Sequence, residues 1–251
     1  MIEVSERDGI AVLTMSHGKA NTLDVAFCNA IADQFDTLRD TPVRGVILTG
    51  TGKIFSAGVD LLQISDGGLN YVKKFLPALH RMFDTVFDFP KPVVAAVNGH
   101  AIAGGCVLAS CADKRIAARD VGRIGVTEVL VGVPFPAMAF EVMRFATNPQ
   151  YFPDVILSGA TYLSEDARTR GLIDEIVEPA ALMDRAFAAA QALAALPPAT
   201  FALTKQQIRQ PVTDRMVLHG KRVDDRVNEI WSGADTLKHI GAYVASTFKK
   251  A

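Results

Sequence analysis

Apolar and polar positions alternate with two different periods in the first part of the chain. Two short apolar runs, Ile2 to Val4 and Ile10 to Met15, flank the dipeptide Asp8-Gly9. Asp-Gly between apolar runs predicts a β-hairpin. From Thr22 to Arg39 the apolar residues instead recur with a helical period, which predicts an amphipathic helix.

The middle of the chain alternates apolar runs of strand length with longer helical patterns. In chain order we predict a strand at 45–49, a helix at 69–87, a strand at 93–97, a helix that starts near Ala103 and a strand at 114–117. Strands that alternate with helices indicate an α/β fold.

Helical patterns dominate from Pro134 onward. We predict helices at 140–145, 164–170, 180–196, 199–209, 214–231 and 235–248, with a strand at 173–177 among them. Pro197-Pro198 and Pro211 are expected to mark helix boundaries. A helical last third suggests an appended lobe used for packing or assembly.

Length, charge and hydropathy exclude several classes of protein. The 251 residues correspond to one large domain, or to one domain with an appendage. Lys and Arg number 26 against 27 Asp and Glu, a net charge of -1, so no nucleic acid partner is expected. The apolar segment 92–112 has the length of a membrane span. Its interior Asn98, Gly99, Gly104 and Gly105 fit a strand, a glycine turn and a buried helix better, so we expect no membrane span.

Cysteine and histidine usage predicts neither disulfides nor a metal site. The three cysteines form an odd count without a C-x-x-C motif, which favours reduced thiols in the cytoplasm. The five histidines do not pair at metal-ligand spacing, so no metal is expected. The N-terminus is charged from Glu3 onward and lacks the apolar core of a signal peptide.

Two glycine-containing turns are the candidate chemistry of this sequence. Residues 55–60 (F-S-A-G-V-D) and 98–105 (N-G-H-A-I-A-G-G) each follow a predicted strand, and the second turn opens a helix. Backbone N–H groups that converge from such turns would form an oxyanion hole, and a helix N-terminus adds partial positive charge. The alternative is two ordinary tight turns that use glycine for backbone freedom. Spacing alone leaves both interpretations open.

These turns resemble the signature segments of the crotonase (enoyl-CoA hydratase/isomerase) superfamily. The matching segments are F-S-A-G-V-D-L at 55–61, V-N-G-H-A-I-A-G-G-C at 97–106, K-A-N-T-L-D at 19–24, K-P-V-V-A-A-V-N-G at 91–99, C-A-D-K-R-I-A at 111–117 and L-S-E-D-A-R-T-R-G-L-I-D-E-I-V at 163–177. The resemblance implies a crotonase-like α/β spiral of ββα units with an acyl-CoA site over residues 1–195. It also implies a helical region over 196–251 for oligomerisation and pocket closure, as a homotrimer or a dimer of trimers.

The resemblance also assigns residues to the site. The backbone N–H groups of Val59 and Gly104 become the oxyanion donors, with the thioester carbonyl between them. Further contacts with the acyl-CoA substrate are expected from Lys19, Ala20, Ala57, Gly58, Asp60, Leu61, Leu62, Gly105, Val107 and Phe135. For Lys19, a solvated surface lysine is the alternative. Ala103 stands where the family often has a glycine. No cofactor is expected, because coenzyme A enters as part of the substrate.

The reaction depends on which acids accompany the donors. Family hydratases use two glutamates, and at the matching positions this chain has Val107 and Glu128. A third acid, used by dienoyl-CoA isomerases, would lie near Phe135. One glutamate without a water-holding partner is the pattern of Δ3,Δ2-enoyl-CoA isomerases, whose P-A-G-G-C motif resembles I-A-G-G-C at 102–106. We therefore expect Glu128 to carry a proton from C2 to C4. The expected apolar walls are Val107, Leu130, Val133 and Phe135.

Alternatives remain at the level of both protein and residue. The chain could be a hydratase or an acyl-CoA hydrolase whose second acid comes from elsewhere, or a non-catalytic acyl-CoA-binding homologue. For Glu128 the alternative is a structural salt bridge at a strand end. Asp60 is expected to stabilise a turn and His100 to be structural. Glu141 and Glu165 are expected on solvated helix faces.

Overall fold

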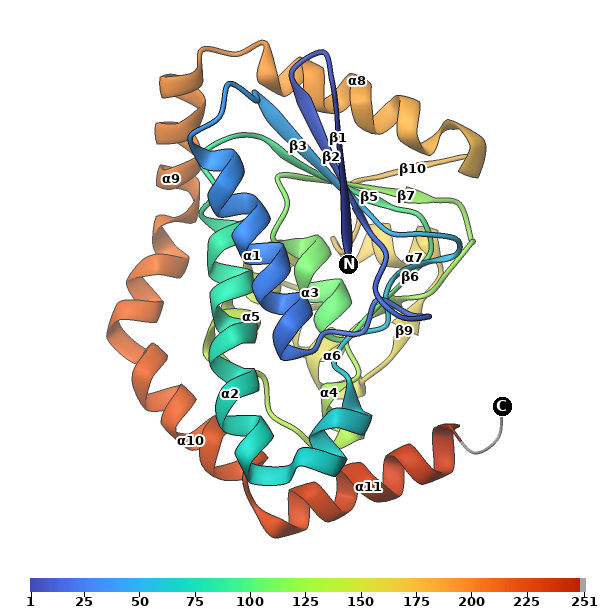
Figure 1. The fold of residues 1–251 in the computed structure, drawn as a ribbon, viewed down its shortest axis with the longest axis vertical. Coiled ribbons are helices and arrows are strands. Elements are labelled where there is room, and N and C mark those ends of the chain that lie inside the picture. The colour runs from blue at the N-terminus through green and yellow to red at the C-terminus, as the bar shows by residue number, and fades with distance from the viewer. Residues whose placement is uncertain (249–251) are drawn as a thin grey trace.

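Two β-sheets form the centre of the molecule, and helices cover them (Figure 1). The computed structural model describes residues 1–248. The larger sheet has six strands in the order β1-β2-β3-β5-β7-β10. These strands are β1 (Ile2–Arg7), β2 (Ile10–Met15), β3 (Gly45–Thr49), β5 (Val93–Val97), β7 (Lys114–Ala118) and β10 (Glu175–Val177). The β1-β2 pair is the predicted hairpin, and the other neighbours are parallel.

The smaller sheet has four short strands in the order β4-β6-β8-β9. They are β4 (Ile54–Ser56), β6 (His100–Ile102), β8 (Ile124–Gly125) and β9 (Thr161–Tyr162). The first three are parallel to one another, and β9 pairs antiparallel with β8.

The chain repeats one structural unit three times. Each unit places one strand in the larger sheet, the next strand in the smaller sheet, and then a helix. The helices of the three units are α2 (Leu61–Phe87), α3 (Gly104–Ser110) and α4 (Glu128–Val131). This succession is the predicted spiral of ββα units. Because β3, β5 and β7 are parallel to one another, and β4, β6 and β8 are too, the turns that follow the strands of each set meet at one edge.

The remaining helices surround this spiral and form most of the C-terminal third. They are α1 (Val25–Arg39), α5 (Ala137–Ala146), α6 (Phe152–Ser158), α7 (Ser164–Thr169), the 3-10 turn η1 (Pro179–Ala181), α8 (Leu182–Ala194), α9 (Pro198–Arg215), the π-helical turn η2 (Met216–Gly220), α10 (Lys221–Trp231) and α11 (Ala234–Phe248). The Asp24 side chain caps α1 by accepting a hydrogen bond from Phe27 N at 2.7 Å.

The larger sheet is buried on both faces. One face packs against α8, where Val12, Ile47 and Val94 contact a cluster that includes Leu182 and Ala186. The opposite face joins the main core beneath α1, α2 and α3. Burial on both faces explains why β3 and β5 are unbroken apolar runs rather than alternating ones.

Several predicted boundaries are wrong. Pro211 lies inside α9 rather than at its end, and buried Arg209 and Val212 hold the helix on both sides of it. The helix predicted over 214–231 is divided, because a π-helical turn separates α9 from α10. The helix predicted to start at Leu69 begins at Leu61, with a break at Gly68 (φ 53°, ψ -145°).

Across residues 1–248, no single helix has both the length and the apolar character needed to cross a membrane. One pair of helices, Pro179–Ala194 with Pro198–Trp231, together has the length and composition of a membrane span, but the two helices are bent by 102° relative to each other.

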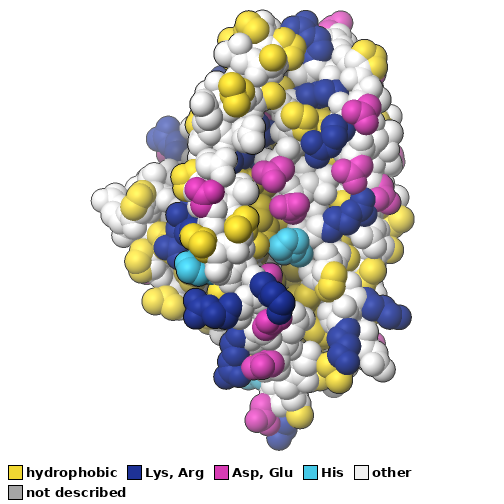
Figure 2. All heavy atoms as spheres, turned by 90° about the vertical axis from the view of Figure 1, so that its left-hand side faces the viewer, with side chains coloured by type: hydrophobic (Ala, Val, Ile, Leu, Met, Phe, Trp, Pro, Cys, Tyr) yellow, Lys and Arg dark blue, Asp and Glu magenta, His cyan; other side chains and the backbone are white. Residues whose placement is uncertain are grey.

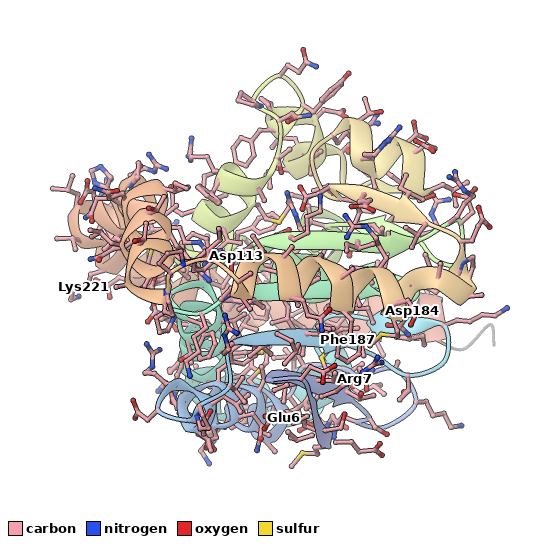
Figure 3. The ribbon with its side chains drawn as sticks, turned by 90° about the horizontal axis from the view of Figure 1, so that it is seen from above. Glu6, Arg7, Asp113, Asp184, Phe187 and Lys221 are labelled. Carbon is pink, nitrogen blue, oxygen red and sulfur yellow. The ribbon has the colours of Figure 1, made fainter. Side chains whose placement is uncertain are left out.

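A buried ion cluster joins α9 to the spiral. Its carboxylate, Asp113, is labelled in Figure 3. Asp113, at the start of β7, accepts hydrogen bonds from Lys205 Nζ at 2.6 Å, Arg209 Nη2 at 2.7 Å and Val93 N at 2.8 Å. The three ionic side chains are only 13%, 7% and 5% exposed. The Arg209 guanidinium also lies 4.1 Å from the centre of the Phe87 ring. Burial lowers the pKa of Lys205 to about 8.

We predict that Asp113→Asn lowers the free energy of unfolding by about 3–5 kcal/mol, because it leaves two buried cations without their carboxylate. Urea unfolding followed by circular dichroism measures the change. The matched control is Asp225→Asn, which breaks an exposed pair with Lys221 and should change stability little. Equal effects of the two substitutions would contradict a special role for the buried cluster.

Candidate active site

The first of the two turns follows β4 and depends on Gly58. This residue has φ 85°, and an added Cβ would lie 2.7 Å from Ile102 O and 2.8 Å from the Cβ of Ala103. The same added atom would lie 3.3 Å from Gly104 N. The two turns predicted from the sequence are therefore in direct contact, and only glycine allows that approach.

The second turn contains a strained residue directly before α3. Ala103 has φ 50° and ψ -127°, a conformation that favours glycine. Its own N–H donates to Gly125 O at 2.8 Å, which fixes the turn against β8. Gly105 allows α3 to approach β4, because an added Cβ would lie 2.3 Å from Ser56 O. The chain thus holds a conformation that favours glycine with an alanine at residue 103.

The backbone N–H groups of Val59 and Gly104 are free at the contact of the two turns. Among residues 1–248, neither group has a hydrogen-bond acceptor in the protein. Leu23 fixes the first turn from both sides, since Leu23 N donates to Gly58 O at 2.8 Å and Asp60 N donates to Leu23 O at 3.0 Å. The geometry therefore presents two unpaired donors to the space in front of them.

That space is a cavity of about 350 Å³ with mostly apolar walls. It is lined by Ala20, Thr22, Ala57, Val59, Asp60, Leu61, Leu62, Leu79, Phe83, Ile102, Ala103, Gly104, Val107, Thr127, Glu128, Val131, Val133, Pro136, Ala139, Trp231 and Tyr243. Ligand sites of this kind combine apolar walls with a few placed polar groups. Asp60, Glu128 and Tyr243 are the ionisable side chains of this lining.

Glu128 is the buried acid of the cavity. It is the first residue of α4 and is 8% exposed. Its Oε2 has no hydrogen-bond partner among the described residues. Burial raises the pKa of Glu128 to about 7, and the backbone N–H groups of Glu128 and Thr127 partly offset the rise. The structural salt bridge considered for this residue does not form with any described side chain.

Val107 lines the same cavity as a fully buried apolar residue. Asp60, the other carboxylate of the cavity, caps α2 by accepting hydrogen bonds from Leu62 N and Gln63 N, both at 3.1 Å. Its predicted role in the turn is thus observed as a helix cap. Glu128 is the carboxyl group of the cavity without such a structural task.

The structure brings most of the predicted site residues together. Those that line the cavity are Ala20, Ala57, Val59, Asp60, Leu61, Leu62, Gly104, Val107 and Glu128. Gly58 and Gly105 lie behind the lining as packing glycines. Lys19 is an exposed residue outside the lining. His100 is structural as expected, since its Nδ1 accepts from Arg123 N at 3.2 Å.

Three expectations about this region need correction. Phe135 does not line the cavity. It lines a neighbouring pocket instead and packs edge-on against Phe140, with 6.2 Å between the ring centres. Leu130 is no wall either, since it is 51% exposed and packs against Gly159. Glu141 is not solvated, because its side chain is 12% exposed and pairs with Arg144 and Arg215.

Several lining residues were not anticipated from the sequence. Leu79 and Phe83 are one helical turn apart on α2, so their spacing was a usable signal. Trp231 and Tyr243 come from α10 and α11, and nothing local in the sequence connects them to the turns. No group of three or more His, Cys, Asp or Glu side chains within residues 1–248 is placed to hold a metal ion.

Fold and cavity together define an α/β protein with an apolar ligand site, two free backbone donors and one buried carboxyl group. The sequence profile of the family described as enoyl-CoA hydratase/isomerase matches residues 5–243. A putative enoyl-CoA hydratase from Thermus thermophilus is 32% identical over 210 residues, which cover 82% of each chain. The chain belongs to the enoyl-CoA hydratase/isomerase family.

Solved structures agree with this assignment. An enoyl-CoA isomerase from Mycobacterium tuberculosis is 29% identical with a TM-score of 0.77, and the match covers 96% of this chain and 97% of that one. The human mitochondrial delta3-delta2-enoyl-CoA isomerase has a TM-score of 0.94 over 99% and 98% of the two chains. Its identity is 23%, so this likeness concerns the fold. The relatives carry both hydratase and isomerase names.

The raised pKa of Glu128 has a consequence for stability. A buried carboxyl that holds its proton more tightly than in the unfolded chain destabilises the folded state once it ionises. The free energy of unfolding should therefore fall as pH rises from about 4.5 through about 7. A shift of this size corresponds to about 3 kcal/mol.

We predict that Glu128→Gln removes this pH dependence, so that the variant gains stability relative to the wild type as pH rises to 8. Urea unfolding at several pH values measures the difference. The exposed Glu165→Gln serves as the control and should keep the wild-type profile. Parallel profiles for the wild type and Glu128→Gln would show that the carboxyl is not buried as described.

Proposed function

We propose that the protein is a Δ3,Δ2-enoyl-CoA isomerase in which Glu128 is the single base. One observation carries the proposal. The cavity holds a buried carboxyl group whose Oε2 has no partner among the described residues, and the position of the second acid is taken by Val107, which can neither hold water nor transfer a proton. A hydratase of this family uses two glutamates, and the other carboxyl group of the cavity, Asp60, is occupied as the cap of α2.

The backbone donors supply the electrostatic part of the mechanism. The thioester carbonyl of the substrate would accept hydrogen bonds from the N–H groups of Val59 and Gly104. Negative charge builds on this oxygen when a proton leaves C2. Each donor of this kind typically contributes about 3–4 kcal/mol of transition-state stabilisation. The two donors need no reorganisation, because the contact between the turns already fixes them.

Proton transfer completes the reaction. The ionised Glu128 removes a proton from C2, and the electron pair forms a dienolate whose charge rests on the thioester oxygen. The same carboxyl returns the proton to C4, so that the double bond moves from C3–C4 to C2–C3. The pKa of about 7 suits this role, since a base works best when its pKa is near the working pH. The apolar walls keep water from the intermediate.

The test is to incubate the protein with a 3-enoyl-CoA and to identify products by mass spectrometry and NMR. The expected product is the conjugated 2-enoyl-CoA without a 3-hydroxyacyl product. Glu128→Gln should lower kcat by about 10²–10⁴-fold, because a positioned base contributes that factor. The wild-type rate should rise with pH through about 7 and then level, since only the ionised carboxyl accepts a proton.

The exposed Glu165→Gln should retain wild-type turnover. A 3-hydroxyacyl product at a comparable rate would instead support a hydratase, the name carried by the Thermus thermophilus relative. Binding of the thioester without turnover of any enoyl substrate would support an acyl-CoA-binding protein.

We also propose assembly as a homotrimer, by itself or paired into a dimer of trimers, through the helical region 196–251, of which residues 249–251 lie outside the described chain. Figure 2 shows the face that carries α9 and α10, where hydrophobic side chains lie among charged ones. Val217 and Leu218 on this region are 82% and 71% exposed, which supports a buried role in an assembly. Light scattering should give three or six times the 27.0 kDa chain mass, and a monomer would contradict the proposal.

The three cysteines, Cys28, Cys106 and Cys111, are free and buried, and we propose a reducing compartment such as the cytoplasm for the enzyme.

A further inference from the structure

Trp231 lines the cavity and is fixed there by a hydrogen bond. It is the last residue of α10, is 1% exposed and lines the cavity. Its indole Nε1 donates a hydrogen bond to Pro134 O at 2.9 Å. The segment after α4 that contains Pro134 also supplies Val133 and Pro136 to the cavity wall. The indole is therefore fixed at its polar edge, and the residue lines the cavity in which an acyl chain would lie.

Helix α2 runs from the free donors to Trp231, so positions along it give the separation between the two. Phe83 of α2 lies at the donor end, because a Cβ added at Gly104 would be 3.9 Å from Phe83 Cζ. Leu79, one turn away, lines the cavity as well. Phe75, one turn further, has its ring centre 6.2 Å from that of Trp231. Phe75 and Phe83 are eight residues apart, which corresponds to about 12 Å along a helix.

The space behind Trp231 is filled by further aromatic rings. Phe75 is completely buried, and its ring stacks on Tyr71 with 5.9 Å between centres. The Tyr71 hydroxyl accepts a hydrogen bond from Val25 N at 3.3 Å, which fixes this second layer to the start of α1. In Figure 1, α10 lies against the lower part of α2. An acyl chain that reaches Trp231 thus meets two successive layers of fixed aromatic side chains.

We propose that Trp231 determines the acyl chain length that the enzyme accepts, and that its substrates are short-chain enoyl-CoA thioesters. This inference rests on the proposed isomerase function. One methylene group more or less in an apolar pocket changes kcat/KM by about 10-fold or more. A fixed end wall therefore separates chain lengths sharply, whereas a flexible wall would not.

The experiment compares kcat/KM for trans-3-hexenoyl-CoA and trans-3-dodecenoyl-CoA. The wild type is expected to prefer the hexenoyl thioester by at least 10-fold. Trp231→Leu removes the outer layer of the wall, so the dodecenoyl-to-hexenoyl ratio should rise at least 10-fold. Trp231→Phe keeps most of the bulk but loses the hydrogen bond to Pro134 O, and should give an intermediate ratio.

Phe89→Leu is the matched control. Phe89 is a completely buried aromatic residue whose ring centre lies 5.1 Å from that of Phe35, and it does not line the cavity. It should leave the ratio unchanged. If Trp231→Leu does not fold, calorimetric titration of the wild type with saturated acyl-CoA thioesters replaces it. Affinity should then rise with chain length up to a limit and fall beyond it.

The outcomes separate this inference from the proposed function. Failure of the wild type to isomerise either substrate would overturn the proposed function itself. Isomerisation of both substrates with similar kcat/KM, and a ratio that Trp231→Leu does not change, would overturn the role of Trp231 and leave the isomerase proposal intact. A continuous gain in affinity with chain length in the wild type would also contradict an end wall at this position.

Discussion

Burial of one carboxyl group without a structural partner is the constraint on which the rest of the site depends. Glu128 lies at the start of a four-residue helix inside an apolar cavity, and removing a charged group from water is unfavourable. The pKa of Glu128 is raised to about 7 because burial disfavours its charged form. A protein that uses Glu128 only for structure would gain stability by replacing it with an apolar residue. The burial of this acid therefore points to chemistry that takes place in the cavity.

The spiral of ββα units makes such an arrangement possible. Parallel strands of the small sheet end at one edge, so the turn after β4 and the turn after β6 lie against each other. The contact at Gly58 leaves no room for a side chain, and the strained Ala103 completes the second turn. Backbone geometry thus presents the two free donors, while side chains from other elements supply the buried carboxyl group and the walls.

The sequence predicted those features that depend on local patterns. Buried strands such as Val93–Val97 were clear, because a short unbroken apolar run between turn residues is typical of a strand covered on both faces. The paired turns and Glu128 could be assigned because short segments resemble the family. The helix boundary predicted at Pro211 was wrong, since tertiary packing carries α9 through this residue. Trp231 was not identified as a cavity residue, because only the folded chain brings α10 to α2.

In the proposed mechanism a single carboxyl carries the same proton from C2 to C4 in a site closed to water. This is tested by a single turnover of a 3-enoyl-CoA with both C2 hydrogens replaced by deuterium, in ordinary water, with the product analysed by NMR. Part of the deuterium removed from C2 should appear at C4 of the 2-enoyl-CoA. Loss of all the removed deuterium to solvent, with only hydrogen at C4, would contradict a water-excluded shuttle by Glu128.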